Sequence, residues 1–265
     1  MMRKVKNIAY WLFAVGYLVT ALSFISGEIN GARCRSVEVR ILDETGNRFV
    51  DKNEVLNIIT DAGIRLMNQP FDSINLDRLE ALITRHPQIR GTEVYGTPSG
   101  QLRIDIDQRS PAVRIVNMTG ESYYIDTDGM PMKLSDKYTS HVLVANGRIE
   151  EPYSALAGKN MGEMEAVSPL AEKFVADDIF RLAMFIRADP FWNAQIDQVF
   201  INRKREIELI PMVGAHVIIL GTTDEIEEKF ENLEMLYRRG LSKVGWTKYS
   251  TINLKYKNQV VCTKR

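Results

Sequence analysis

The pattern of hydrophobic and polar positions divides the chain into an apolar N-terminal stretch and a long region of short amphipathic segments. No charged residue occurs from Asn7 to Gly27, and these 21 residues span roughly 30 Å as a helix, the thickness of a bilayer core. Tyr10 and Trp11 stand at the N-terminal edge, where aromatic rings favour the membrane interface. The pattern predicts a cytoplasmic tail over residues 1–7 and a transmembrane helix over residues 8–27.

The charges around this stretch predict its orientation. Basic residues precede it, and lysine and arginine are enriched on the cytoplasmic side of membrane helices, so we expect an inner-membrane protein whose C-terminal part is periplasmic. A cleaved signal peptide is the alternative, but its apolar core is usually shorter and no small-x-small cleavage site stands out after Ile25. A lipoprotein site at Cys34 is disfavoured, because Arg33 fills a position that needs a small residue.

The segments over residues 34–109 predict a small module with the order strand, helix, helix, strand, strand. Hydrophobic and polar side chains alternate in the first strand, as in a half-buried strand. Asp51 and Glu54 form a capping box for the first helix, and Asn75 can cap the second. The expected elements are a strand over Ser36–Leu42, helices from Asp51 to Ala62 and from Asn75 to Pro87, and strands over Ile89–Tyr95 and Leu102–Ile106.

Residues 110–265 predict a strand-rich mixed domain. Ser168 and Pro169 are typical of a helix start, and we expect Thr222 and Glu225 to cap a further helix that runs to Arg239 and stops at Gly240. The expected strands are Ala112–Val116, Tyr123–Asp126, Val142–Ala145, Gln195–Asn202, Glu206–Pro211, His216–Leu220, Thr251–Tyr256 and Gln259–Cys262. The whole chain is therefore predicted to be α+β: a transmembrane helix, a β-α-α-β-β domain, then a strand-rich mixed α/β domain.

Composition and charge narrow the functional classes. The chain of 265 residues is 45% hydrophobic and 26% charged, which is typical of a folded protein. Its 34 basic and 34 acidic residues balance, and without the three basic residues that precede the apolar stretch the net charge is about −3, so the charge disfavours a nucleic-acid binder. Two cysteines, Cys34 and Cys262, are too few for a disulfide scaffold, and whether they pair is left open.

No motif for catalysis or metal binding occurs in the sequence. The chain has no S-x-x-K, G-x-S-x-G, H-E-x-x-H, P-loop or G-x-G-x-x-G pattern. Its histidines, His86, His141 and His216, are scattered, and none has a Cys, Asp or Glu at a convincing metal-ligand spacing. We therefore predict a protein that binds other proteins, with no catalytic residue, no cofactor and no metal. A periplasmic hydrolase with an unrecognised site is the alternative from a different class.

Several segments resemble the FtsQ/DivIB family of bacterial cell-division proteins in their order and spacing. Ile74–Ile89 with the following Glu93-Val-Tyr95 resembles the second helix and next strand of that family's POTRA domain, a module that binds polypeptides. Leu102–Pro111 resembles the next strand and its exit, and Tyr123–Gly129 resembles the hairpin that opens the family's second domain. The resemblance covers nearly the whole chain and implies a non-enzymatic scaffold of the division machinery at the septum, which links early and late septal proteins.

The resemblance also implies a partner and a binding site. In the family, the terminal strands of the second domain receive the periplasmic part of an FtsB/FtsL-type coiled-coil protein, which adds a strand. An edge strand offers unpaired main-chain groups to such a segment. The implied partner-binding residues are Thr251, Ile252, Asn253, Leu254, Lys255, Tyr256, Gln259, Val260 and Val261. The plain alternative is that Thr251–Cys262 only closes the sheet.

A second functional hypothesis also fits a POTRA-like module. Other membrane proteins carry such modules and assist protein export or outer-membrane assembly. They would show repeated modules or a following barrel, whereas one module is visible here and the C-terminal half lacks the regular alternation of barrel strands.

Overall fold

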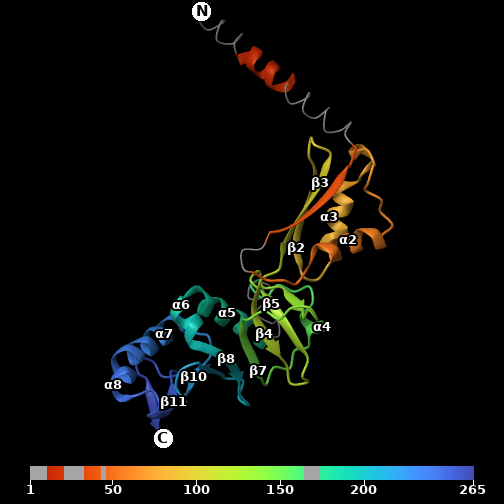
Figure 1. Cartoon of the computed structure of the whole chain (residues 1–265). Helices are drawn as coiled ribbons and strands as arrows, with labels where there is room; N and C mark the ends of the chain where they lie inside the picture. Colours follow the sequence, from red (N-terminus) through yellow and green to blue (C-terminus); the bar gives the residue numbers. More distant parts are fainter. Residues whose placement is uncertain (1–10, 21–32, 43–45, 164–173) are drawn as a thin grey trace, which may run out of the picture. The chain divides into compact units, whose positions relative to one another are not determined.

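The computed structural model describes residues 11–20, 33–42, 46–163 and 174–265 (Figure 1). The chain divides into two compact units, Met1–Gln108 (unit 1) and Arg109–Arg265 (unit 2). Each unit has its own sheet and is described by itself.

The N-terminal stretch is described only in part. Residues 11–20 are helical and lie within the predicted transmembrane helix, and residues 8–10 and 21–27 of that prediction lie outside the described residues. Within the part of the chain that the structure describes, no helix combines the length and the apolar character needed to cross a membrane.

Unit 1 has the predicted order of elements. They are β1 (Ser36–Leu42), α2 (Lys52–Asp61), the short 3₁₀ helix η1 (Phe71–Ser73), α3 (Leu76–Thr84), β2 (Ile89–Gly96) and β3 (Gln101–Gln108). Both predicted caps form, because the Asp51 carboxylate accepts the Glu54 amide at 2.9 Å and the Asn75 side chain accepts the Arg78 amide at 2.9 Å. Local hydrogen bonds therefore begin α2 and α3 where the sequence predicts.

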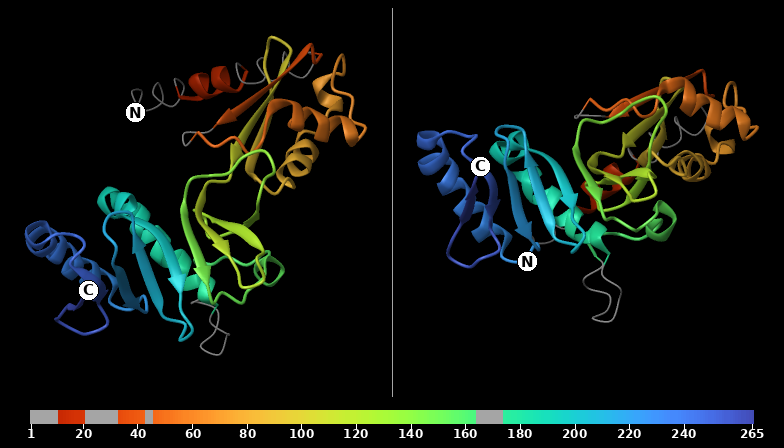
Figure 2. Two further views of the ribbon diagram at one scale, coloured as in Figure 1. Left: turned by 60° about the horizontal axis from the view of Figure 1, so that its bottom comes forward. Right: turned by 90° about the horizontal axis from the view of Figure 1, so that it is seen from below.

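The sheet of unit 1 has the order β1-β3-β2, with β1 parallel and β2 antiparallel to β3. Helices α2 and α3 lie on one face of this sheet (Figures 1 and 2). Their buried residues share a helical face and pack with the inward residues of the strands; among them are Val55, Ile59, Leu79, Ile83, Val39, Leu102, Ile104 and Ile106. The opposite face carries charge pairs, including Arg40 with Asp105 at 3.0 Å.

Unit 2 is built on a nine-stranded sheet with the order β12-β11-β10-β9-β8-β7-β4-β5-β6. Its first strands are β4 (Pro111–Val116), β5 (Ser122–Asp126), β6 (Pro131–Lys133), β7 (Leu143–Gly147) and β8 (Ile196–Ile201). The later strands are β9 (Ile207–Pro211), β10 (Val217–Gly221), β11 (Tyr249–Asn253) and β12 (Val261–Lys264). The helices are α4 (Tyr153–Leu156), α5 (Val175–Ala188), α6 (Pro190–Gln195), α7 (Ile226–Met235), the π-helical turn η3 (Leu236–Leu241) and α8 (Ser242–Val244). The mixed α+β class of the prediction is confirmed.

The core of unit 2 lies between this sheet and helices α5, α6 and α7 (Figure 2). Aromatic side chains form its centre near α6. The ring of Trp192 lies 5.0 Å from that of Phe230 and 5.7 Å from that of Tyr237. These contacts stabilise the packing of α7 and η3 against α6 and the sheet, because buried aromatic pairs contribute stability beyond that of their buried apolar area.

The predicted start and stop of the helix after β10 are wrong. The Thr222 hydroxyl bonds the Asp224 carboxylate instead of a helix amide, and Glu225 has a positive φ of 51° without a side-chain cap. The helix continues through Gly240 as η3 and α8. Burial of Tyr237 and Leu241 holds this turn, and such burial outweighs the cost of about 1 kcal/mol for glycine in a helix.

The helical region before β8 is described only in part, and it contains one helix that was not predicted. Residues 164–173, which include the expected start at Ser168 and Pro169, lie outside the described residues. The described helix α5 begins at Val175, whose amide donates to the buried Glu151 carboxylate at 2.7 Å. After α5 a second helix, α6, begins because Asp189 caps it and Pro190 fits its first turn.

Candidate functional site

The candidate site is the end of the unit 2 sheet that β11 and β12 form. Strand β11 runs parallel to β10 on one side and antiparallel to β12 on the other, so it lies inside the sheet. Strand β12 is outermost, and no described strand pairs with its outer side. Among the predicted residues, Ile252 lies opposite Cys262 and Asn253 lies opposite Val261.

The two terminal strands have different limits from those expected. The prediction of a strand over Thr251–Tyr256 is wrong at its C-terminal end, because β11 stops at Asn253. The Asn253 side chain accepts the Lys255 amide at 3.0 Å, which turns the chain, and Leu254 is buried in the core. Leu254 therefore packs inside unit 2 and does not present its side chain to a partner.

The last strand begins and ends later than expected. The prediction for Gln259–Cys262 is wrong because β12 spans Val261–Lys264. The Gln259 amide donates to the Tyr256 carbonyl at 3.4 Å, and Asn258 has a positive φ of 59°, so these residues form a turn before the strand. The predicted residues Gln259 and Val260 thus lie in the approach to β12, and Val260 is partly buried against the core.

Alternation of main-chain groups shows which part of β12 faces outward. The Arg265 amide donates to the Lys248 carbonyl of the neighbouring segment at 3.2 Å. In an antiparallel pair, successive residues direct their N–H and C=O groups alternately toward and away from the partner strand. The groups of Cys262 and Lys264 therefore face away from β11, and they are the ones that an added strand can pair with.

The loop between β11 and β12 is held by two ion pairs. Lys255 Nζ lies 2.5 Å from Glu206 Oε1, and Lys257 Nζ lies 2.9 Å from Glu225 Oε1. The hydrogen bond from Lys255 lowers the pKa of Glu206, and the hydrogen bond to Glu225 raises the pKa of Lys257. Between the two lysines, the side chain of Tyr256 is half exposed.

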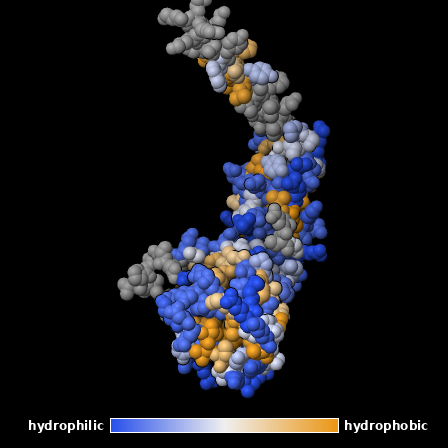
Figure 3. Space-filling view, turned by 90° about the vertical axis from the view of Figure 1, so that its left-hand side faces the viewer, coloured by the Kyte–Doolittle hydropathy of each residue, from blue (hydrophilic) through white to orange (hydrophobic). Residues whose placement is uncertain are grey.

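Two side chains with apolar surface, Tyr256 and Val261, are exposed near this end of the sheet. Tyr256 is 50% exposed and Val261 is 42% exposed, although both follow or begin strands of the core sheet. Figure 3 shows unit 2 from the side of Figure 1 that carries α7, α8 and β11, and hydrophobic surface there is bordered by hydrophilic surface. An apolar surface with a polar border is typical of a protein interface.

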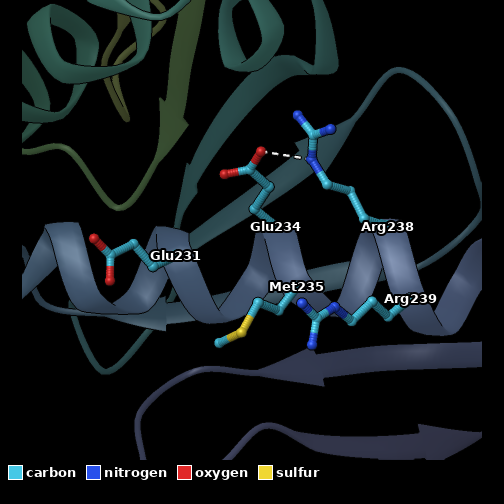
Figure 4. A pocket seen from close by; sticks show the side chains of 5 residues that line it. All are labelled: Glu231, Glu234, Met235, Arg238 and Arg239. Carbon is cyan, nitrogen blue, oxygen red and sulfur yellow. Dashed lines mark hydrogen bonds and ion pairs between the residues drawn. The ribbon is translucent and has the colours of Figure 1, made fainter.

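A shallow depression of about 310 Å³ lies along the outer face of α7 and η3 (Figure 4). It is lined by Glu231, Glu234, Met235, Arg238 and Arg239. Arg238 pairs with Glu234 at 2.6 Å, while Met235 and Arg239 project from the other side of the helix. A π-helical turn such as η3 is rare and is often found at functional sites, since it shifts the side chains that follow it.

A buried histidine connects the elements behind this end of the sheet. His216 precedes β10, and its Nε2 lies 3.0 Å from the Tyr237 hydroxyl of η3. The Tyr237 ring makes an edge contact with Trp246, which lies just before β11, with ring centroids 5.1 Å apart. Burial lowers the pKa of His216, so its neutral form fits this packing.

The sequence missed the residues that complete the free edge. Cys262 and Lys264 carry the outward main-chain groups, and neither was among the predicted binding residues. The run of β-branched and small residues from Val260 to Thr263 is the signal that could have extended the strand. The arrangement can bind an extended segment through its main chain. Among the residues that the structure describes, no three His, Cys, Asp or Glu side chains are grouped to hold a metal ion.

Comparison with protein families identifies both units. The family model described as FtsQ/DivIB, C-terminal related, matches residues 110–263, and a model described as a POTRA-like domain matches residues 32–107. A search of curated proteins found no match. FtsQ/DivIB proteins are in general non-catalytic and septal membrane-associated. Because the first match covers more than half of the 265 residues, the chain belongs to the FtsQ/DivIB family and has a role in cell division, in which it interacts with other proteins.

Proposed function

We propose that this protein is a non-enzymatic scaffold of the division machinery that binds its partner by strand addition to β12. The partner is the periplasmic part of an FtsB/FtsL-type coiled-coil protein, and the complex links early and late septal assembly. The proposal includes a membrane anchor over residues 8–27 and periplasmic domains over residues 34–109 and 110–265.

The observation that carries the proposal is the outer side of β12, with which no strand in the described part of the chain pairs. Main-chain groups there are exposed together with Tyr256 and Val261, which are apolar. An added segment gains main-chain hydrogen bonds from the edge and apolar contacts from these side chains. When the partner covers these half-exposed side chains, the binding free energy becomes more favourable by about 25 cal/mol for each Å² of apolar surface that leaves water.

A proline at Cys262 tests strand addition. Proline lacks the N–H that faces outward, and an edge strand tolerates it when that N–H is not bonded within the sheet. We expect Cys262→Pro to reduce capture of the coiled-coil partner about tenfold, which corresponds to about 1.4 kcal/mol. The measurement is co-purification from cells with the full-length protein in mild detergent.

The matched control is Cys262→Ala, which also loses the thiol but keeps the N–H. It should capture the partner at the wild-type level. Equal capture by the proline and alanine variants would show that the partner does not add a strand at this edge. Tyr256→Asp, which places a charge on the apolar surface beside the edge, should also weaken capture, and unchanged capture would remove Tyr256 from the site.

A further inference from the structure

Charge is distributed very unevenly along this chain. Residues 236–265 contain eight of the 34 basic residues and no aspartate or glutamate. The remaining 235 residues therefore carry 26 basic and all 34 acidic residues. The balanced total conceals a C-terminal segment of about +8 attached to a body of about −8. This segment is the one that forms η3, α8, β11 and β12.

Half of these basic side chains are already used within unit 2. They hold the loop, the helix surface and the C-terminal residue in place: Lys255 pairs with Glu206, Lys257 with Glu225 and Arg238 with Glu234, and the Arg265 guanidinium donates to the Ala215 carbonyl. The other four are exposed and make no ion pair with any residue that the structure describes; they are Arg239, Lys243, Lys248 and Lys264.

Two of the four free basic residues lie at the open edge. Lys264 lies on β12 opposite Tyr249, and the Lys248 carbonyl accepts the Arg265 amide, so both lysines belong to the end of the β11–β12 hairpin. Arg239 and Lys243 follow the exposed Met235 at intervals of four residues along η3 and α8, which places them about one turn apart on one helical face.

We propose that the segment that adds to β12 is acidic, with glutamate or aspartate side chains that contact Lys264 and Lys248 at the edge. This inference rests on the proposed strand addition and specifies the chemistry of the partner. Only a polypeptide satisfies the outward N–H and C=O groups of Cys262 and Lys264, so the edge favours an acidic peptide over an anionic lipid surface. The free cations then select its charge and speed its association.

The probes for this proposal are three synthetic 12-residue peptides of alternating valine and threonine in which four threonines are replaced by glutamate, glutamine or lysine. Their binding to the full-length protein in mild detergent is measured by fluorescence anisotropy at 50 and 300 mM salt. We expect the glutamate peptide to bind about tenfold more tightly than the glutamine peptide at low salt, and to lose most of this preference at high salt.

Two variants locate the effect. In Lys248→Gln with Lys264→Gln, the glutamate peptide should bind about 3- to 10-fold more weakly than to wild type, as expected for the loss of two exposed ion pairs. The matched control is Lys52→Gln with Arg65→Gln, which removes two exposed charges from unit 1 and should leave binding unchanged. A glutamate peptide that binds no more tightly than the lysine peptide, or equally to both variants, would overturn the proposal.

The proline variant separates this proposal from strand addition itself. If Cys262→Pro weakens the glutamine and glutamate peptides by the same factor, and the wild-type protein shows no salt-dependent preference between them, strand addition stands and the acidic partner is refuted. If Cys262→Pro leaves the affinities of all three peptides at the wild-type level and the glutamate preference persists, the charge selection stands and strand addition fails. Binding to vesicles of anionic phosphatidylglycerol that is stronger than peptide binding, and is lost in the Lys248 and Lys264 variant, would assign the basic edge to a lipid surface and also overturn the proposal.

Discussion

A substitution at Leu254 tests which side chains at the terminal strands belong to the core and which belong to the proposed interface. Leu254 is 3% exposed and follows β11, and its amide donates to the Ile219 carbonyl at 2.9 Å. Removal of a buried leucine side chain costs about 2–5 kcal/mol through lost apolar burial and the cavity that remains. Because Leu254 lies near the end of the sheet, where neighbours can relax, we expect Leu254→Ala to cost about 2–3 kcal/mol.

The assay is thermal unfolding of the full-length protein in mild detergent, followed by tryptophan fluorescence. In a unit of this size, 1 kcal/mol shifts Tm by about 2–4 °C, so Leu254→Ala should lower Tm by about 4–12 °C. Tyr256→Ala is the matched control, because Tyr256 is half exposed and should change Tm by less than about 2 °C while it weakens partner capture. A Leu254→Ala protein with wild-type Tm and abolished capture would refute the placement of Leu254 in the core.

Three further predictions concern the interior of unit 2. Glu151→Ala removes the carboxylate that accepts the hydrogen bond of the Val175 amide at the start of α5. In urea denaturation it should lower the free energy of unfolding by about 1–2 kcal/mol, and Glu151→Gln, whose amide oxygen can still accept, should lower it by less. Burial lowers the pKa of His216 below its ordinary 6.5, so as the pH falls this histidine is protonated in the unfolded chain before it is protonated in the folded protein. The contribution of His216 to stability should therefore be complete above pH 6.5 and decline below it. Measurements of Tm from about pH 7.5 to 5.5 should show this decline in the wild type and a smaller decline in His216→Asn. Gly147 has a φ of 98° and a Cβ there would lie 2.3 Å from the Ile201 carbonyl oxygen, so Gly147→Ala should lower Tm by at least about 6 °C, and a change under 2 °C would contradict this packing.

Local chemistry made several elements of this fold predictable. Asp51 and Asn75 bond amides only three residues further along the chain, so a short stretch of sequence contains the whole helix start. The alternation over Ser36–Leu42 likewise needs only a sheet with one buried face. By contrast, Gly240 and Leu254 were misjudged because their conformations depend on distant packing partners, which no local pattern names.

The candidate site was likewise predictable from the sequence only in part. Residues Thr251–Tyr256 and Gln259–Val261 were assigned by resemblance, and the sequence correctly indicated a strand, a turn and a second strand in this region. Which strand lies outermost follows from pairing across the whole sheet, since β11 pairs with β10 although α7, η3 and α8 separate the two strands in the sequence. The outward groups of Cys262 and Lys264 follow from that pairing and from the register of one hairpin.

The sequence by itself therefore determined the strands and helices whose capping and alternation lie within a few residues, the absence of known catalytic motifs, and the resemblance to a division family. The tertiary structure alone decided the strand order, the continuation of the last helix through a glycine, and the position of Lys248 and Lys264 beside an open edge. The physical reason is range: caps and alternation act between near neighbours, whereas an edge exists only when every other strand of the sheet has found its partner.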